Sequence, residues 1–319
     1  MKRNHILTLL RQLLVCLALF VAATACNKNN TSSGSGGSGS TITMILANST
    51  NATMFDSAVI RVHLDTVFSG VGPYTVFVPT NSSFANSGIT SAMISAMPDS
   101  VVRNIILYHT IGASLLSSNF PPGSDNKIVT ANGDSVFTTY NNFGLFVNGI
   151  QVVAGDVIAS NGVLDVVNYV LLPPSGTILQ TLQADTAYTF LVAALNTCSS
   201  VLNLDSLLAA PGIYTMFAPS NSAFIAAGYP NIAAVTSANP DSLANVLSYH
   251  VVPGRSFTCD YSQSQMLPTV NGNTLTMLVN GLSTFQVQGK LNATPSNIVY
   301  GNVMARNGVI HGVDQVLLP

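Results

Sequence analysis

The sequence predicts an α+β protein made of two tandem copies of one domain. Two eleven-residue phrases are nearly identical: YTVFVPTNSSF, beginning at Tyr74, and YTMFAPSNSAF, beginning at Tyr214. Further paired motifs follow in the same order at almost the same spacing, which indicates a duplicated domain rather than a short-period repeat. In each copy, apolar residues at helical spacing come first and apolar runs with turn signals come later, an order typical of α+β domains.

The paired motifs set the domain boundaries. The pairs are Tyr108-His109 with Tyr249-His250, Asn132-Gly133 with Asn271-Gly272, and the closing segment 161–173 with segment 307–319. Both closing segments begin with Asn-Gly-Val and end with Val-Leu-Leu-Pro. We therefore expect one domain over residues 41–173 and a second over residues 175–319, because each range holds a complete set of motifs.

Helices are predicted where apolar residues recur every three or four positions. One such stripe covers residues 42–46 and another covers 101–106. The second stripe follows Pro98-Asp99-Ser100, so Asp99 is placed to cap the first free amides of its helix, and Asp241 has the same place in the second copy.

Strands are predicted over residues 74–78 and 163–172, with the second stopped by Pro173. The two Asn-Gly pairs predict tight hairpin turns in which both central residues have positive φ.

The repeated phrase is interpreted as a corner between a strand and a helix. Its alternating apolar residues, with Phe77 or Phe217 at the centre, bury a strand. Pro79 or Pro219 ends that strand because proline cannot donate to a β-ladder. The pairs expected to cap the following short helix, which turns Phe84 or Phe224 inward, are Thr80-Asn81 and Ser220-Asn221.

These motifs together resemble the fasciclin-like (FAS1, beta-Ig-h3) domain in both copies, over about residues 41–319. The resemblance implies a β-wedge or sandwich carrying several helices, found in extracellular adhesion and matrix proteins and lacking a known catalytic centre. The motif residues to which the resemblance gives a mainly structural role are Phe77, Pro79, Asn81, Tyr108, His109, Phe217, Pro219, Asn221, Tyr249, His250 and His311.

The amino terminus predicts export and membrane attachment. Residues 1–25 have a basic start, an apolar stretch and small residues before Cys26, as in a signal peptide. Cys26 at that position resembles a bacterial lipobox, which implies a lipidated cysteine and a lipoprotein at the outer membrane or cell surface. Residues 26–40 are rich in Gly, Ser and Asn, a composition typical of a flexible tether.

The charge and motif content exclude several classes of function. The formal net charge is −2, and loss of the three basic residues before Cys26 leaves seven basic against 12 acidic residues. No dense Lys/Arg cluster exists, which argues against a nucleic-acid partner. Glutamate is absent and no nucleophile elbow, phosphate loop or metalloprotease motif occurs, so we expect no catalytic residues, no cofactor and no enzyme activity.

The histidines and cysteines are scattered. His109, His250 and His311 stand singly, without the close His or Cys spacing of a metal site, so hydrogen bonding is the expected role and no metal is expected. Cys198 and Cys259 lie in the second copy and either form a disulfide in an oxidising compartment or stay as two buried thiols.

Seven of the 12 aspartates are followed by Ser or Thr and then an aliphatic residue. The triplets resemble the acceptor pattern of a bacterial O-glycosylation system for exported proteins, while helix capping is an alternative explanation for several of them. The candidate hydroxyls are those of Ser57, Thr66, Ser100, Ser135, Thr186, Ser206 and Ser242.

Three functions remain open from the sequence. The first is a non-enzymatic adhesion lipoprotein that binds a polysaccharide or a surface or matrix protein, with two copies adding avidity. The second is a structural envelope protein without an external ligand. The third, an enzyme or small-molecule binder, requires a constellation that no motif predicts.

Overall fold

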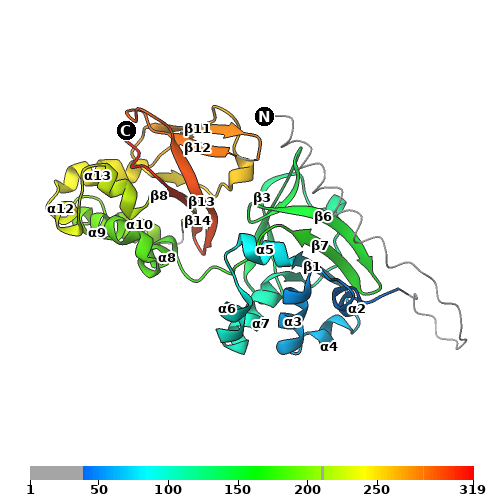
Figure 1. The fold of residues 1–319 in the computed structure, drawn as a ribbon. Helices are drawn as coiled ribbons and strands as arrows, with labels where there is room; N and C mark the ends of the chain where they lie inside the picture. Colours follow the sequence, from blue (N-terminus) through cyan, green and yellow to red (C-terminus); the bar gives the residue numbers. More distant parts are fainter. Residues whose placement is uncertain (1–38, 210–211, 283) are drawn as a thin grey trace, which may run out of the picture.

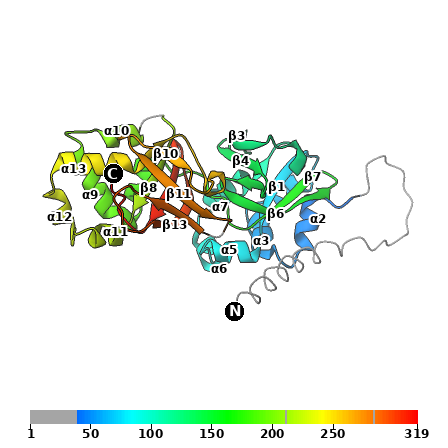
Figure 2. The ribbon, with the colours of Figure 1, turned by 90° about the horizontal axis from the view of Figure 1, so that it is seen from above.

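The computed structural model describes residues 39–209, 212–282 and 284–319. Figures 1 and 2 show two lobes side by side, each with its helices gathered on one side of a sheet. The first lobe (domain 1) ends after strand β7, and the second (domain 2) begins at helix α8. The architecture is α+β twice over, in agreement with the fold class expected from the sequence.

Domain 1 contains a seven-stranded sheet within the described residues, in the order β2-β1-β7-β6-β5-β4-β3. Strands β1 and β7 are parallel and the other neighbours are antiparallel. The strands are β1 (Tyr74–Pro79), β2 (Thr110–Ile111), β3 (Gly123–Val129), β4 (Ser135–Asn141), β5 (Gly144–Val147), β6 (Ile150–Ala159) and β7 (Gly162–Val167). The helices are α2 (Ile42–Ala47), α3 (Thr53–Arg61), α4 (Asp65–Phe68), α5 (Asn81–Asn86), α6 (Ser91–Ala96), α7 (Asp99–Tyr108) and η2 (Ser117–Asn119).

Domain 2 repeats this topology, with described strands in the order β10-β11-β12-β13-β14-β8-β9. Its strands are β8 (Tyr214–Pro219), β9 (Val251–Pro253), β10 (Met266–Pro268), β11 (Thr274–Asn280), β12 (Thr284–Gln288), β13 (Ser296–Ala305) and β14 (Gly308–Val313). Its helices are α8 (Ile178–Ala184), η3 (Thr186–Tyr188), α9 (Thr189–Cys198), α10 (Leu204–Ala209), α11 (Asn221–Ala226), α12 (Ile232–Thr236), α13 (Pro240–Tyr249) and η4 (Thr258–Asp260).

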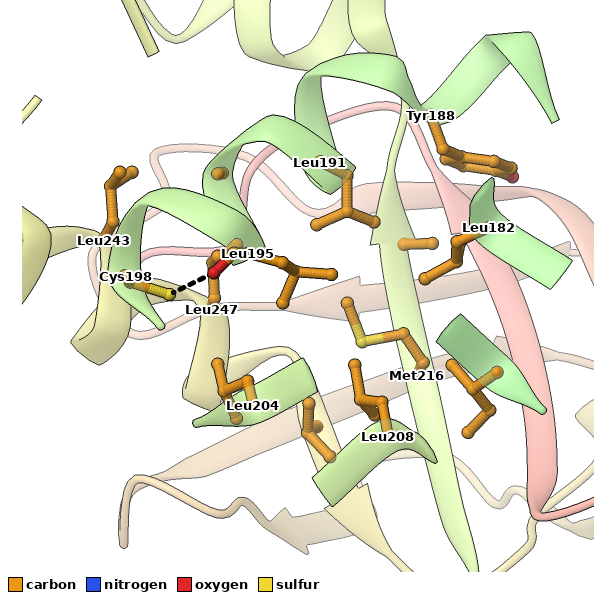
Figure 3. Packing of buried hydrophobic residues seen from close by; sticks show 14 of the residues in the cluster. Leu182, Tyr188, Leu191, Leu195, Cys198, Leu204, Leu208, Met216, Leu243 and Leu247 are labelled. Carbon is orange, nitrogen blue, oxygen red and sulfur yellow. Dashed lines mark hydrogen bonds between the residues drawn. The ribbon is translucent and has the colours of Figure 1, made fainter. Parts of the chain in front are cut away.

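The repeated phrase forms the strand that both cores share. Val76 and Val78 of β1 face the helices, whereas Phe77 faces the opposite core, which also contains Tyr108. In domain 2, Met216 joins the helical core of Figure 3. Because side chains alternate across a strand, a strand buried on both faces must be apolar at successive positions.

Three details of the predicted elements are wrong. Strand β7 ends at Val167 rather than at residue 172, because the chain beyond it leaves the ladder and places Leu171 in the core. Asp99 is the first residue inside α7, and in domain 2 the cap is Asn239, whose side chain accepts the amide of Ser242. A residue already in helical conformation cannot fold its side chain back as an N-cap does.

The Asn-Gly hairpins form, but only their glycines have positive φ, +91° at Gly133 and +88° at Gly272. Asn132 uses its side-chain Oδ1 to accept the amide of Asp134 at 3.0 Å, which closes the turn without a left-handed asparagine.

Candidate functional site

The corner motif makes two kinds of hydrogen bond: one caps the helix that follows the strand, and the other joins that helix to a second helix. Thr80 caps α5 through its Oγ1, which accepts the Ser83 amide at 3.2 Å, and Ser83 Oγ accepts the amide of Thr80 in return. Asn81 does not cap, contrary to expectation. Its Oδ1 accepts the amide of Met54 at 3.0 Å near the start of α3, so it joins two helices.

Domain 2 builds the same corner. Ser220 caps α11 by accepting the amide of Ala223, and Asn221 Oδ1 accepts the amide of Phe190 at 3.0 Å, at the start of α9. Pro79 and Pro219 are the last residues of β1 and β8, as predicted.

The Asn-Gly-Val motif also joins segments that are distant in the sequence. Asn161 Oδ1 accepts the Ile42 amide at 3.0 Å, and its Nδ2 donates to the carbonyls of Phe68 and Gly70. A Cβ at Gly162 would overlap the carbonyl oxygen of Tyr74, so only glycine allows β7 to approach β1 this closely. Asn307 and Gly308 repeat both features in domain 2.

The Tyr-His motif is entirely internal. Tyr108, His109, Tyr249 and His250 are each 0% exposed. His109 Nδ1 lies 2.8 Å from the Ile105 carbonyl, and its Nε2 accepts the amide of Leu171 at 3.0 Å. The acceptor role of Nε2 places the proton on Nδ1, which donates to the carbonyl. Burial accordingly lowers the pKa of His109 to about 4.

His250 has the same arrangement, with Nδ1 at 2.8 Å from the Val246 carbonyl and Nε2 accepting the Leu317 amide at 2.9 Å. Burial lowers its pKa to about 4. Each histidine therefore ties the end of a helix to the closing Leu-Leu-Pro segment of its domain.

The third histidine replaces an aspartate of the first copy. His311 on β14 pairs in register with Phe217, as Asp165 on β7 pairs with Phe77, and both side chains are 0% exposed. His311 Nδ1 accepts the amide of Asn302 at 3.1 Å, and Nε2 donates to the Ser256 carbonyl at 2.9 Å. Burial lowers the pKa of His311 to about 4.

Asp165 makes only the first of these bonds. Its Oδ1 accepts the amide of Asp156 at 2.9 Å, and its Oδ2 is buried without a hydrogen-bond partner in the described structure. Burial raises the pKa of Asp165 to about 6, and the nearby charge of Asp156 adds to the shift. The structure thus places an acidic side chain in domain 1 and a basic side chain in domain 2 at equivalent buried positions.

The two cysteines lie in separate clusters, so no disulfide joins them. Cys198 ends α9 within the helical core, with Sγ 3.4 Å from the carbonyl of Leu195 (Figure 3). Cys259 lies in η4 beside Asp260, and burial raises the pKa of its thiol. Of the alternatives left by the sequence, the structure has two buried thiols.

The described ranges lack the grouping of side chains that a metal site uses. No group of three or more His, Cys or Asp side chains there could hold a metal ion. A hollow of about 200 Å³ lies between α3 and α6 beside Ser57 and Ser91. Its one cation, Arg61, is already bonded to Asp99 and to the carbonyls of Ile94 and Met97.

The candidate glycosylation sites lie mostly at the surface. Six of the seven hydroxyl-bearing residues are exposed, and Ser135 is half-buried at the start of β4. Among the aspartates of these triplets whose side chains are described, Asp185 caps a helix, whereas Asp56, Asp65, Asp99 and Asp241 lie inside the first turn of theirs and Asp134 directly precedes β4. Cys26 and the signal peptide lie outside the described residues.

These observations define a pair of α+β domains in which the repeated motif residues serve as packing and hydrogen-bonding devices. The Fasciclin domain model matches residues 50–173 and 186–319, and the chain therefore belongs to the Fasciclin domain family.

Relatives occur in animals and bacteria. The chain is 25% identical over 253 residues to transforming growth factor-beta-induced protein ig-h3 of Sus scrofa, covering 78% of this chain and 35% of that protein. It is 27% identical over 288 residues to human periostin, covering 86% of this chain and 31% of periostin. It thus spans about a third of these two relatives.

Protein sll1483 of Synechocystis is 32% identical over 184 residues, which cover 57% of this chain and 94% of that protein. Among solved structures, a FAS1 domain pair from the insect cell adhesion molecule Fasciclin I covers 84% of this chain, with 19% identity and a TM-score of 0.41.

Proposed function

We propose that this chain is a non-enzymatic, surface-tethered adhesion lipoprotein that binds a polysaccharide or a surface or matrix protein. Membership of both halves in the Fasciclin domain family is the observation that carries the proposal. The burial of the motif histidines and tyrosines supports it, because these side chains are engaged in the fold and leave binding to the exposed loops and helices.

The proposed anchor is the lipid on Cys26, which fits export of the chain to the outer membrane or cell surface. Within the described ranges, no helix is long and apolar enough to cross a membrane. Thirteen peptide units separate Cys26 from Gly39, so a fully extended chain keeps Gly39 within about 45 Å of the lipid.

The start of the described chain supports an orientation for the pair. The Ser160 amide donates to the Ser40 carbonyl at 3.0 Å, so the chain enters domain 1 beside the turn between β6 and β7. Figures 1 and 2 place domain 2 on the opposite side of domain 1 from this point. In the proposed arrangement, domain 2 is farther from the membrane and is the first to meet an external partner.

We also propose that the exposed Asp-Ser/Thr hydroxyls carry O-linked glycans. Only 7% of the residues are charged, and a sugar coat would supply hydration to a surface with few ionic groups. The exposure of six of the seven hydroxyl-bearing residues supports this proposal.

The test of binding is an array of glycans and matrix proteins probed with the unlipidated mature chain carrying Cys26→Ser. We expect saturable binding to one ligand class, with loss when exposed residues of domain 2 such as Ile232 and Ile225 are replaced by Asp. Replacement of the exposed Val71 of domain 1 is the matched control. Absence of saturable binding on the whole array would favour the alternative, a structural envelope protein without an external ligand.

A further inference from the structure

An arginine of domain 2 is buried against domain 1. The side chain of Arg255 is 3% exposed, and its Nη1 donates to Asp125 Oδ1 at 3.0 Å. The guanidinium carbon lies 3.6 Å from the centre of the Phe137 ring, a cation–π contact across the two domains. A buried charge is tolerated in a protein only when it is paired and bonded, so Arg255 requires its partners on domain 1.

Apolar and polar contacts surround this arginine. Phe146 of domain 1 joins Phe257, Cys259, Met304 and Val309 of domain 2 in one buried cluster, against which Phe137 packs. We call the surface formed by Asp125, Phe137, Phe146, Arg255, Phe257 and Cys259 the junction.

Three hydrogen bonds cross beside the cluster. Thr139 Oγ1 donates to Asp260 Oδ1 at 2.7 Å, and Asn141 Nδ2 donates to the Cys259 carbonyl at 3.0 Å. Asn302 Nδ2 donates to the Gly149 carbonyl at 3.2 Å. The junction therefore has the buried centre and polar rim typical of a specific protein interface.

The two domains use different faces in this contact. Domain 1 contributes strands β3, β4 and β5, whereas domain 2 contributes the loop before η4, η4 itself and the β13–β14 pair. Such a heterologous contact leaves one copy of each face unused at the two ends of the pair, and heterologous contacts that do not close into a ring extend into open arrays.

The unused faces lack the junction side chains. Ser114 follows His109 by five positions, as Arg255 follows His250, and Ser114 is exposed. Ser264 is the counterpart of Asp125 in the second copy, and both residues have a left-handed φ, +63° at Ser264 and +56° at Asp125. Thr276 is the third residue of β11, as Phe137 is of β4. Serine and threonine at these places provide neither the charge pair nor the aromatic face.

We propose that the junction holds the two Fasciclin domains as one rigid body, and that Arg255 makes this contact specific to the internal pair. The position of domain 2 relative to the membrane-proximal end of domain 1 is then fixed by side-chain contacts rather than set by a flexible linker. This inference does not depend on the identity of any ligand.

The test is ¹⁵N relaxation of the mature chain with Cys26→Ser, from which the rotational correlation time of each domain is obtained separately. We expect equal times for both domains in this parent protein. With Arg255→Ser, the residue that the first copy carries, we expect two shorter and unequal times. Asp125→Ser should act in the same direction, and because Asp125 is 37% exposed this variant keeps the fold even if Arg255→Ser does not.

Arg61→Ser is the matched control, because Arg61 also pairs with an aspartate, Asp99 at 2.7 Å, but within domain 1. We expect it to leave the two correlation times equal. Unequal times in the parent protein would overturn the proposal. Equal times in both junction variants, as in the control, would overturn it as well.

Discussion

Lowering the pH should unfold domain 2 before domain 1. Domain 2 buries His250 and His311, each with a pKa lowered by burial from 6.5 to about 4. A lowered histidine pKa means that the folded state disfavours the proton, so stability present above pH 6.5 is lost as the pH falls toward 4. Each histidine contributes about 3 kcal/mol to this loss, and together they contribute about 6 kcal/mol.

Domain 1 contains two groups whose effects oppose each other. His109 destabilises it by about 3 kcal/mol over the same range, because its pKa is also lowered to about 4. Asp165 has a pKa raised from 3.8 to about 6, so its folded form binds the proton more tightly than the unfolded chain does. The stability that this proton binding contributes is fully present below pH 3.8 and is lost as the pH rises through 6. Lowering the pH therefore restores about 3 kcal/mol to the free energy of unfolding of domain 1.

For these four groups the net change is close to zero in domain 1 and is comparable with the whole stability of an ordinary domain in domain 2. Burial also raises the pKa of Asp56 in domain 1 and of Asp260 in domain 2, which opposes the loss on acidification, whereas the lowered pKa of Asp314 adds to the loss in domain 2. Hydrogen exchange read by mass spectrometry at pH values from 7 to 4.5 resolves the two, after correction for the intrinsic exchange rate. We expect peptides of β14 to lose protection while peptides of β7 keep it. Equal loss in both strands, or earlier loss in β7, would refute this reasoning.

Three further predictions concern core packing, the buried acid and modification. Phe217→Ala should lower the free energy of unfolding of domain 2 by about 3–5 kcal/mol, measured by urea denaturation. The reason is that Phe217 is 0% exposed and its ring centre lies 5.6 Å from that of His311. The control is Phe143→Ala at an exposed position, which should cost under about 0.5 kcal/mol. Asp165→Asn should stabilise domain 1 by up to about 3 kcal/mol at pH 7 and little at pH 4, and an equal gain at both pH values would show that ionisation is not the cause. Intact-mass analysis of the protein from its native host should show hexose-sized increments above the lipidated polypeptide, and a mass without them would exclude glycosylation.

The fold class was predictable because its signals are local and repeated. The apolar run around Phe77, the proline at the strand end and the duplicated spacing each indicate an element, and β1 and α5 form as expected, although β1 is apolar at successive positions rather than alternating. The choice between Thr80 and Asn81 as cap was not predictable, because it depends on which residue has extended backbone angles. Only the packed structure shows that Asn81 bonds to the start of another helix.

The sequence held one signal of the junction and none of the partners that Arg255 contacts. Arg255 and Asp125 are separated by 130 residues, and neither stands in a motif that predicts a contact between them. Comparison of the two copies offered one clue, since Arg255 stands where the first copy has Ser114. A charge gained in one copy of a duplicated domain indicates a contact that the other copy does not make, but the partner requires the structure.

The most direct test of the proposed adhesion function is retention of native-host cells under flow on surfaces coated with polysaccharide or matrix protein. Cells with the wild-type chain, cells with Cys26→Ser and cells lacking the chain are compared. We predict that wild-type cells are retained best on at least one coating, and that Cys26→Ser lowers retention to that of the deletion while the protein is released to the medium. Equal retention of all three strains on every coating would contradict adhesion through a lipid-anchored pair of Fasciclin domains.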